Sequence, residues 1–162
     1  MLEINIIGLF YSQIMLSVHG RWEIKIDNSV VIIWFADAWN EEAIVTFCKE
    51  FKQVTLPLIN KQWAIISIFE QWQLGIPAIE FHVAELCQWF KDNGCVKDCH
   101  VYSPSFLKTS QLERIIPHTD SGYERCVFTN AEMAIQWLEE QGYPISNRQY
   151  VYDKFNLPAH SS

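Results

Sequence analysis

The sequence is short of positive charge, glycine and proline, and each shortage excludes a class of protein. Its 162 residues include 12 lysines and arginines against 19 aspartates and glutamates, a formal net charge of -7. An acidic surface repels phosphate groups, so we expect no nucleic-acid partner. Six glycines and six prolines among 49% hydrophobic residues exclude collagen-like, low-complexity and disordered chains. The length instead fits one domain with a sizeable core.

The chain also lacks the patterns that build common catalytic and metal sites. Cys95, Cys99 and His100 have the chemistry of zinc ligands, but they are only three. On a strand, Cys99 and His100 would also point to opposite faces. A phosphate-binding loop needs clustered glycines, and those outside the N-terminal region are isolated: Gly75, Gly94, Gly122 and Gly142. We therefore expect no metal, no cofactor and no catalytic residue.

No pattern in the sequence directs the chain to secretion or to a membrane. The apolar residues 1–18 contain no lysine or arginine and no cleavage site, and they are too short to span a bilayer securely. Five irregularly spaced cysteines predict buried thiols in a reducing compartment. We expect a cytoplasmic protein with an appended segment at 1–16, a domain at 17–143 and an extended aromatic tail at 144–162.

Hydrophobic patterning predicts strands and helices in alternation. Residues 22–27 alternate apolar and polar, as a half-buried strand does, and residues 30–35 form an apolar run typical of a central strand. Asn40 and Asn130 are good helix N-caps. The later elements expected are helices from 40, 76, 106 and 131 and strands at 63–69, 98–103 and 125–128. This order predicts an α/β fold with a mixed, mainly parallel sheet of about five strands.

Particular residues at the starts of these elements carry a family resemblance. They are His19-Gly20-Arg21-Trp22, Ala38-Trp39-Asn40-Glu41-Glu42-Ala43, Trp63-Ala64, Ile76-Pro77-Ala78, and Val127 to Ala131 continuing to Ala134, Trp137 and Leu138. Over residues 17–143 the chain resembles the SpoIIAA-like family of bacterial proteins, a branch of the STAS fold related in shape to Sec14/CRAL-TRIO lipid carriers. The resemblance implies helices chiefly on one face of the sheet. It also implies a binding role without catalysis, with apolar ligands or membrane surfaces as the proposed targets of some relatives.

The resemblance also raises the question of a phosphorylation switch. Similar STAS proteins are phosphorylated on a serine at the start of the helix after the third strand, where free N–H groups favour an added anion. The matching stretch, residues 70–77, contains no serine or threonine. We therefore expect no such switch at that position.

In its place, the loop 70–77 and its surroundings offer large apolar side chains and one carboxylate. We predict an apolar mouth at the end of the sheet that binds an apolar small molecule, a lipid or a membrane surface. The negative charge counts against the membrane. An alternative is that the same side chains fill a wider core. The candidate residues are Trp39, Glu70, Trp72, Leu74, Ile76 and Phe81.

The helix expected at 131–141 has a second apolar face. Met133 and Trp137 are four residues apart and lie opposite its buried stripe, so something must cover them. The cover is the N-terminal segment, the aromatic tail or a second subunit. Three functions follow: a non-catalytic binding or regulatory module, a homodimeric interaction module that uses this helix, or an enzyme for a small apolar substrate.

Overall fold

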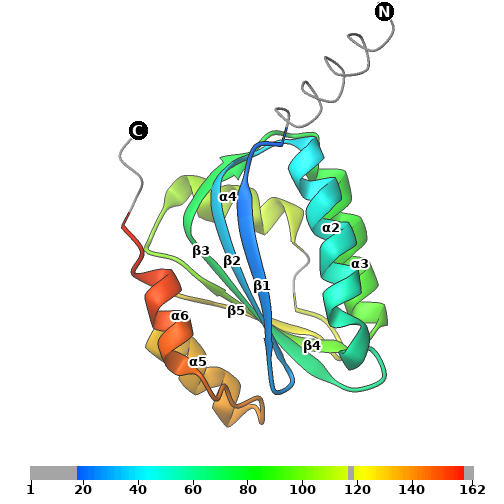
Figure 1. Ribbon diagram of the computed structural model, residues 1–162, viewed down its shortest axis with the longest axis vertical. Helices are drawn as coiled ribbons and strands as arrows, with labels where there is room; N and C mark the ends of the chain where they lie inside the picture. Colours follow the sequence, from blue (N-terminus) through cyan, green and yellow to red (C-terminus); the bar gives the residue numbers. More distant parts are fainter. Residues whose placement is uncertain (1–17, 117–118, 159–162) are drawn as a thin grey trace, which may run out of the picture.

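Five strands form one sheet in the order in which they occur along the chain (Figure 1). The computed structural model describes residues 18–116 and 119–158, so the segment expected at 1–16 lies outside the described residues. The strands are β1 (Arg21–Asp27), β2 (Val30–Trp39), β3 (Trp63–Gly75), β4 (Cys95–Val101) and β5 (Glu124–Phe128). β1 is antiparallel to β2, and the other neighbours are parallel. The predicted mixed, mainly parallel sheet is confirmed.

Helices lie on both faces of this sheet. One face carries α2 (Glu41–Thr55), α3 (Ile79–Asp92) and α4 (Phe106–Ile115), and the other carries α5 (Ala131–Glu140) and α6 (Arg148–Phe155). A short 3-10 helix, η1 (Leu56–Leu58), follows α2. The predicted N-caps are confirmed, because the side chains of Asn40 and Asn130 accept hydrogen bonds from the backbone N–H of Ala43 and Met133.

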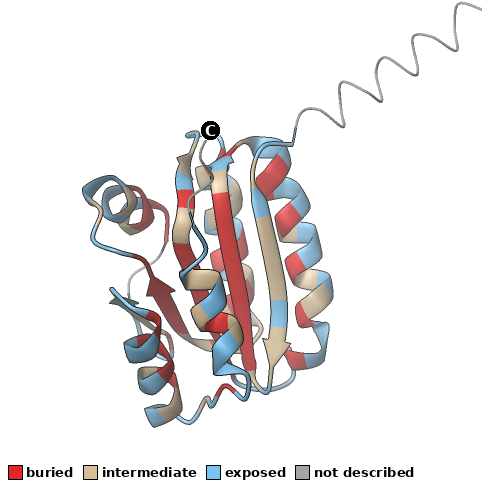
Figure 2. Cartoon of the chain, turned by 60° about the vertical axis from the view of Figure 1, so that its left-hand side comes forward, coloured by how far each residue is buried: buried red, intermediate tan, exposed pale blue. Residues whose placement is uncertain are grey.

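The strand side chains divide between two hydrophobic layers. Val31, Ile33 and Phe35 of β2 face α2, α3 and α4, whereas Val30 and Ile32 face α5 and α6. Because β2 and β3 are covered on both sides, they read as continuous apolar runs in the sequence. Figure 2 shows the central strands buried along most of their length, whereas β1 is at most half-buried.

Two segments differ from the expectation. The loop expected at 70–77 is mostly strand, because β2 continues to Trp39 and pairs Asp37 with Trp72 and Trp39 with Gly75. The extended tail expected at 144–162 contains the helix α6, which packs on β3 and α5. Its capping residue Asn147 accepts a hydrogen bond from the N–H of Tyr150. The resemblance implied helices chiefly on one face of the sheet. Three of the helices lie on one face, and α5 and α6 together cover the opposite face.

In the described part of the chain, no helix combines the length and the apolar character needed to cross a membrane.

Candidate ligand-binding cavity

A cavity of about 80 Å³ lies between the sheet and the layer of α2, α3 and α4. Its walls are almost entirely apolar and come from three strands and three helices, among them Phe35, Phe69, Trp72, Val83 and Leu112. A dry cavity of roughly 150 Å³ with similar walls binds benzene. The cavity therefore suits a short aliphatic chain or part of a small ring.

Three buried polar side chains border this apolar space on the sheet side. Ser67 on β3 and His100 on β4 are paired across the two strands. Asp98 precedes His100 by two residues, so both side chains point to the same face. Asp98 is 3% exposed and His100 is 1% exposed. A carboxylate and an imidazole this deeply buried require partners, because removing either from water is costly.

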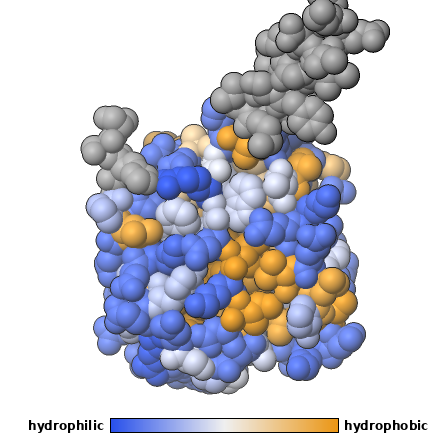
Figure 3. Space-filling view, in the orientation of Figure 1, coloured by the Kyte–Doolittle hydropathy of each residue, from blue (hydrophilic) through white to orange (hydrophobic). Residues whose placement is uncertain are grey.

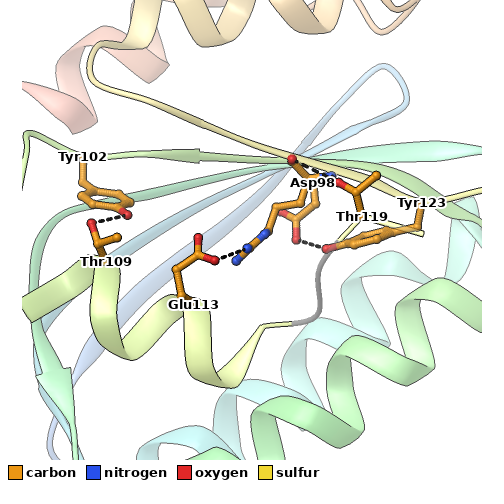
Figure 4. Close-up of polar contacts among 7 residues, drawn as sticks. Asp98, Tyr102, Thr109, Glu113, Thr119 and Tyr123 are labelled. Atoms are coloured by element: carbon orange, nitrogen blue, oxygen red, sulfur yellow. Dashed lines mark hydrogen bonds and ion pairs between the residues drawn. The ribbon is translucent and has the colours of Figure 1, made fainter. Parts of the chain in front are cut away.

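The partners of Asp98 are a residue of its own strand, β4, and the residue just before β5. The Tyr123 hydroxyl donates a 2.5 Å hydrogen bond to Oδ2 of Asp98 (Figure 4). Nε2 of His100 lies 3.2 Å from Oδ1. Burial alone would raise the pKa of Asp98, but His100, the Tyr123 hydroxyl and the nearby Arg125 outweigh it and lower that pKa. Asp98 is therefore a carboxylate at neutral pH.

The same carboxylate fixes the protonation state of Tyr123. Burial, followed by the charge of Asp98 and their hydrogen bond, raises the pKa of the Tyr123 hydroxyl well above its ordinary value. The phenol therefore stays protonated and acts as a donor. Nearby, the Arg125 guanidinium donates to Glu113 of α4 over 2.9 Å, which ties the helix above the cavity to β5.

His100 has one ring nitrogen without a partner. Its Nδ1 is buried and makes no hydrogen bond with any described residue. In a neutral ring, the carboxylate 3.2 Å from Nε2 favours the proton on that nitrogen, which leaves Nδ1 as an acceptor. The ring also packs edge-on against Phe69, with the ring centres 5.3 Å apart. A ligand hydroxyl would supply the donor that Nδ1 lacks.

The described side chains around the cavity form no nucleophile–base pair with His100. Nucleophilic catalysis needs a hydroxyl or thiol in hydrogen-bond contact with its base. Cys87 borders the cavity, but burial raises the pKa of its thiol far above neutrality. Among residues 18–116 and 119–158, no three histidine, cysteine or acidic side chains gather as a metal site requires.

The structure divides the residues predicted for the apolar mouth. Trp39 and Trp72 are buried and line the cavity. Leu74 is half-buried at the margin of the same core. Ile76 and Phe81 lie outside, 48% and 66% exposed. The predicted mouth is therefore not one surface: its tryptophans belong to the cavity wall, and its most exposed members face solvent.

Glu70, the predicted polar member of the mouth, binds the backbone after β4. Its two carboxylate oxygens accept hydrogen bonds from the N–H and the hydroxyl of Ser103, at 2.6 and 2.8 Å. Lys108 of α4 donates to the carbonyl oxygens of Phe69 and Glu70. Glu70 therefore joins β3 to the turn before α4, and it does not line the cavity.

We expect Glu70→Gln to weaken this turn without affecting the cavity. The amide loses the charge that strengthens both hydrogen bonds, so the free energy of unfolding should fall by about 1 kcal/mol. Urea denaturation of the variant measures that loss. Ligand binding in the cavity should keep the wild-type affinity, and a weaker affinity would return Glu70 to the site.

The sequence did not predict the polar side chains that border the cavity, because they are far apart along the chain and meet only in the folded sheet. Ser67, Asp98 and Tyr123 are ordinary residues when each is taken alone. One local signal was present: an aspartate and a histidine two residues apart on a strand share a face. Such a pair in an otherwise apolar strand indicates a buried polar cluster.

The residues predicted for a second interface lie on α5. Met133 is 51% exposed. Trp137 is half-buried, because Phe128 of β5 packs against its ring with centres 5.8 Å apart and the Lys97 ammonium lies over it. Residues of the same chain therefore shield much of the Trp137 ring from solvent.

Comparison with known proteins identifies the fold. No protein-family model matches the sequence, and no curated protein matches it. Among solved structures, the chain is similar to an uncharacterised protein of the DUF3478 family from Shewanella loihica, described as having a SpoIIAA-like fold. The TM-score is 0.56 at 8% identity, over 75% of this chain and 94% of that chain. The expected SpoIIAA-like fold is thus confirmed, and at this identity the likeness concerns the fold alone.

Proposed function

We propose that this protein is a non-catalytic binding module that holds a small, mainly apolar molecule with one hydroxyl group. The observation that carries the proposal is the apolar cavity bordered by His100, whose Nδ1 lacks a hydrogen-bond partner. An apolar pocket with few polar groups is the usual form of a small-molecule site. The apolar walls would take up the hydrocarbon part, and Nδ1 of the imidazole would accept a hydrogen bond from the hydroxyl group.

The charge state of the polar border favours a neutral ligand. Asp98 is ionised, and its charge is directed toward His100 and Tyr123. A ligand carboxylate would place a second negative charge beside this buried aspartate, which a low-dielectric interior penalises. A hydroxyl group avoids that repulsion. The proposed ligand class is therefore an alcohol or phenol and not a fatty acid.

We also assign the module to a reducing compartment such as the cytoplasm. All five cysteines are free, and three of them, Cys87, Cys95 and Cys99, are buried. Disulfides form and persist in oxidising compartments, where small domains commonly use them. Free thiols in a chain with its own core favour a cytoplasmic location.

Titration with short linear alcohols from ethanol to butanol, followed by two-dimensional NMR of the labelled protein, tests this function. Saturable shifts should concentrate at amides around the cavity, such as Val83 and Leu112. The corresponding methyl ethers cannot donate a hydrogen bond, so they should bind about tenfold more weakly, the effect of one lost hydrogen bond of ordinary strength.

A bulkier side chain in the cavity should prevent this binding. Val83 borders the cavity and is half-buried, so Val83→Phe fills part of the space and should weaken butanol binding at least about tenfold. Val45→Phe makes the same change at an exposed position of α2 and should leave binding unchanged. The proposal fails if no alcohol produces saturable shifts around the cavity, or if both variants bind equally well.

A further inference from the structure

The outer edge of β1 is open among the described residues. β1 ends the sheet order and pairs only with β2, and it lies in front of the other strands in Figure 1. Every second residue of such an edge strand presents its backbone N–H and C=O away from the sheet. This edge can therefore accept another strand.

An apolar surface accompanies this open edge. The side chains of Trp22, Ile24 and Ile26 point toward α2, and all three are only partly buried. Figure 3 shows an apolar region between β1 and α2, on the side of the molecule that faces the viewer. The Trp22 indole is held there by a 2.8 Å hydrogen bond from its Nε1 to Glu50 of α2. A partner strand on this edge would extend over the apolar region.

The sequence of β1 is complementary to itself in one antiparallel arrangement. If two copies pair about a two-fold axis at Ile24, each charged residue faces an opposite charge and each apolar residue faces an apolar one. Cross-strand pairs of these kinds stabilise antiparallel sheets. The pairs, with the partner's residue second, are Arg21 with Asp27, Trp22 with Ile26, Glu23 with Lys25, and Ile24 with Ile24.

Neighbouring arrangements lack this complementarity. Shifting the axis to residue 23 places Glu23 against its own copy and Arg21 against Lys25. Shifting it to residue 25 places Lys25 against its own copy and Glu23 against Asp27. A parallel pairing in register sets every charge against the same charge. Axes at Trp22 or Ile26 also avoid like charges, but each pairs only three residues of β1, so the axis at Ile24 gives the most complete match.

We propose that a second copy of this chain binds at β1, antiparallel about a two-fold axis at Ile24, so that the two sheets become continuous. The charged side chains are already ordered on the α6 side of the strand. Arg21 is bonded to Asp37, Glu23 to Lys154, and Asp27 accepts from the N–H groups of Ser146 and Asn147. Because these intrachain contacts already restrict the side chains, pairing with the charges of the second copy costs less side-chain entropy on association.

The mass of the full chain in solution tests this interface. Light scattering after size-exclusion chromatography should give twice the chain mass of 19.0 kDa for the wild-type protein. Lys25→Glu places two glutamates opposite each other at both symmetric positions, so the dimer dissociation constant should rise at least about tenfold. The double variant Glu23→Lys with Lys25→Glu restores opposite charges across the axis and should recover the dimer.

Two comparisons separate this interface from other causes. Lys61→Glu makes the same charge change at an exposed lysine outside β1 and should leave the dimer intact. Circular dichroism of each variant shows that the fold persists. A wild-type protein that is monomeric at its highest soluble concentration overturns the proposal. A dimer that survives Lys25→Glu overturns it as well, and its loss in Trp137→Glu would then assign the interface to α5.

Discussion

Replacing Asp98 with alanine should lower the free energy of unfolding by about 2–6 kcal/mol, because two buried polar groups lose their partner at about 1–3 kcal/mol each. Asp98 is buried in the centre of the core and holds both the Tyr123 hydroxyl and the His100 imidazole. Without the carboxylate, both groups remain buried, and the phenol has no acceptor. Urea denaturation at neutral pH, followed by circular dichroism, measures the loss.

The same carboxylate should make stability depend on pH in one direction. The folded-state pKa of Asp98 is lowered relative to that of the unfolded chain, which is about 3.9. Its contribution is therefore complete above that value and is lost as the pH falls through the folded-state pKa. The stability difference between the wild-type protein and Asp98→Asn should shrink on acidification from neutral pH to about pH 3.

An exposed aspartate provides the comparison for this measurement. Asp153 of α6 is exposed, and Asp153→Asn should change stability little at any pH. If Asp98→Asn is equally destabilised at neutral and acidic pH, the ionised carboxylate does not supply the stability. The hydrogen bond from Tyr123 to a neutral Asp98 would then explain the destabilisation.

The parts of the fold that could be predicted from the sequence are those with a strong local pattern. β2 and the first half of β3 are apolar runs because both of their faces are covered, and α2 and α5 begin at asparagine caps. The second half of β3 was expected as a loop, because its partner is the end of β2, far away in the sequence. Pairing with a distant strand leaves no local periodicity from which to predict it.

The helix α6 was missed for a related reason. Its one fully buried residue is Val151, and Tyr150, Tyr152 and Phe155 are each only half-buried. A helix that rests on a sheet through so few contacts has no regular apolar stripe. The aromatic composition of the tail correctly indicated a segment that packs on the domain, but it did not indicate the conformation.

The candidate site was predictable only in part. Trp39 and Trp72 belong to the cavity, because large aromatic side chains near the carboxyl ends of parallel strands meet the ends of the covering helices. Phe81, predicted for the mouth, lies off the buried face of α3 and is exposed to solvent. Helical periodicity indicates which side chains avoid the core, and it does not indicate what lies opposite them.

Replacing Trp72 with alanine should lower the free energy of unfolding by about 3–5 kcal/mol, because it removes a large buried side chain. The Trp72 indole borders the cavity and packs against Phe69, with ring centres 5.4 Å apart. Its removal should enlarge the space in which we propose that ligands bind. Free indole has the shape of the lost side chain, so it should bind the variant and restore part of the stability.

Urea denaturation of Trp72→Ala with and without indole tests this expectation. At an indole concentration of about 100 times its dissociation constant, binding should return about 2.7 kcal/mol. The matched change Trp137→Ala removes a half-buried tryptophan from the other face of the sheet, so it should cost less and gain nothing from indole. Equal recovery of both variants would show that indole binds without regard to the cavity. If Trp72→Ala lowers the free energy of unfolding by less than about 1 kcal/mol, the Trp72 ring is not packed tightly in the cavity wall.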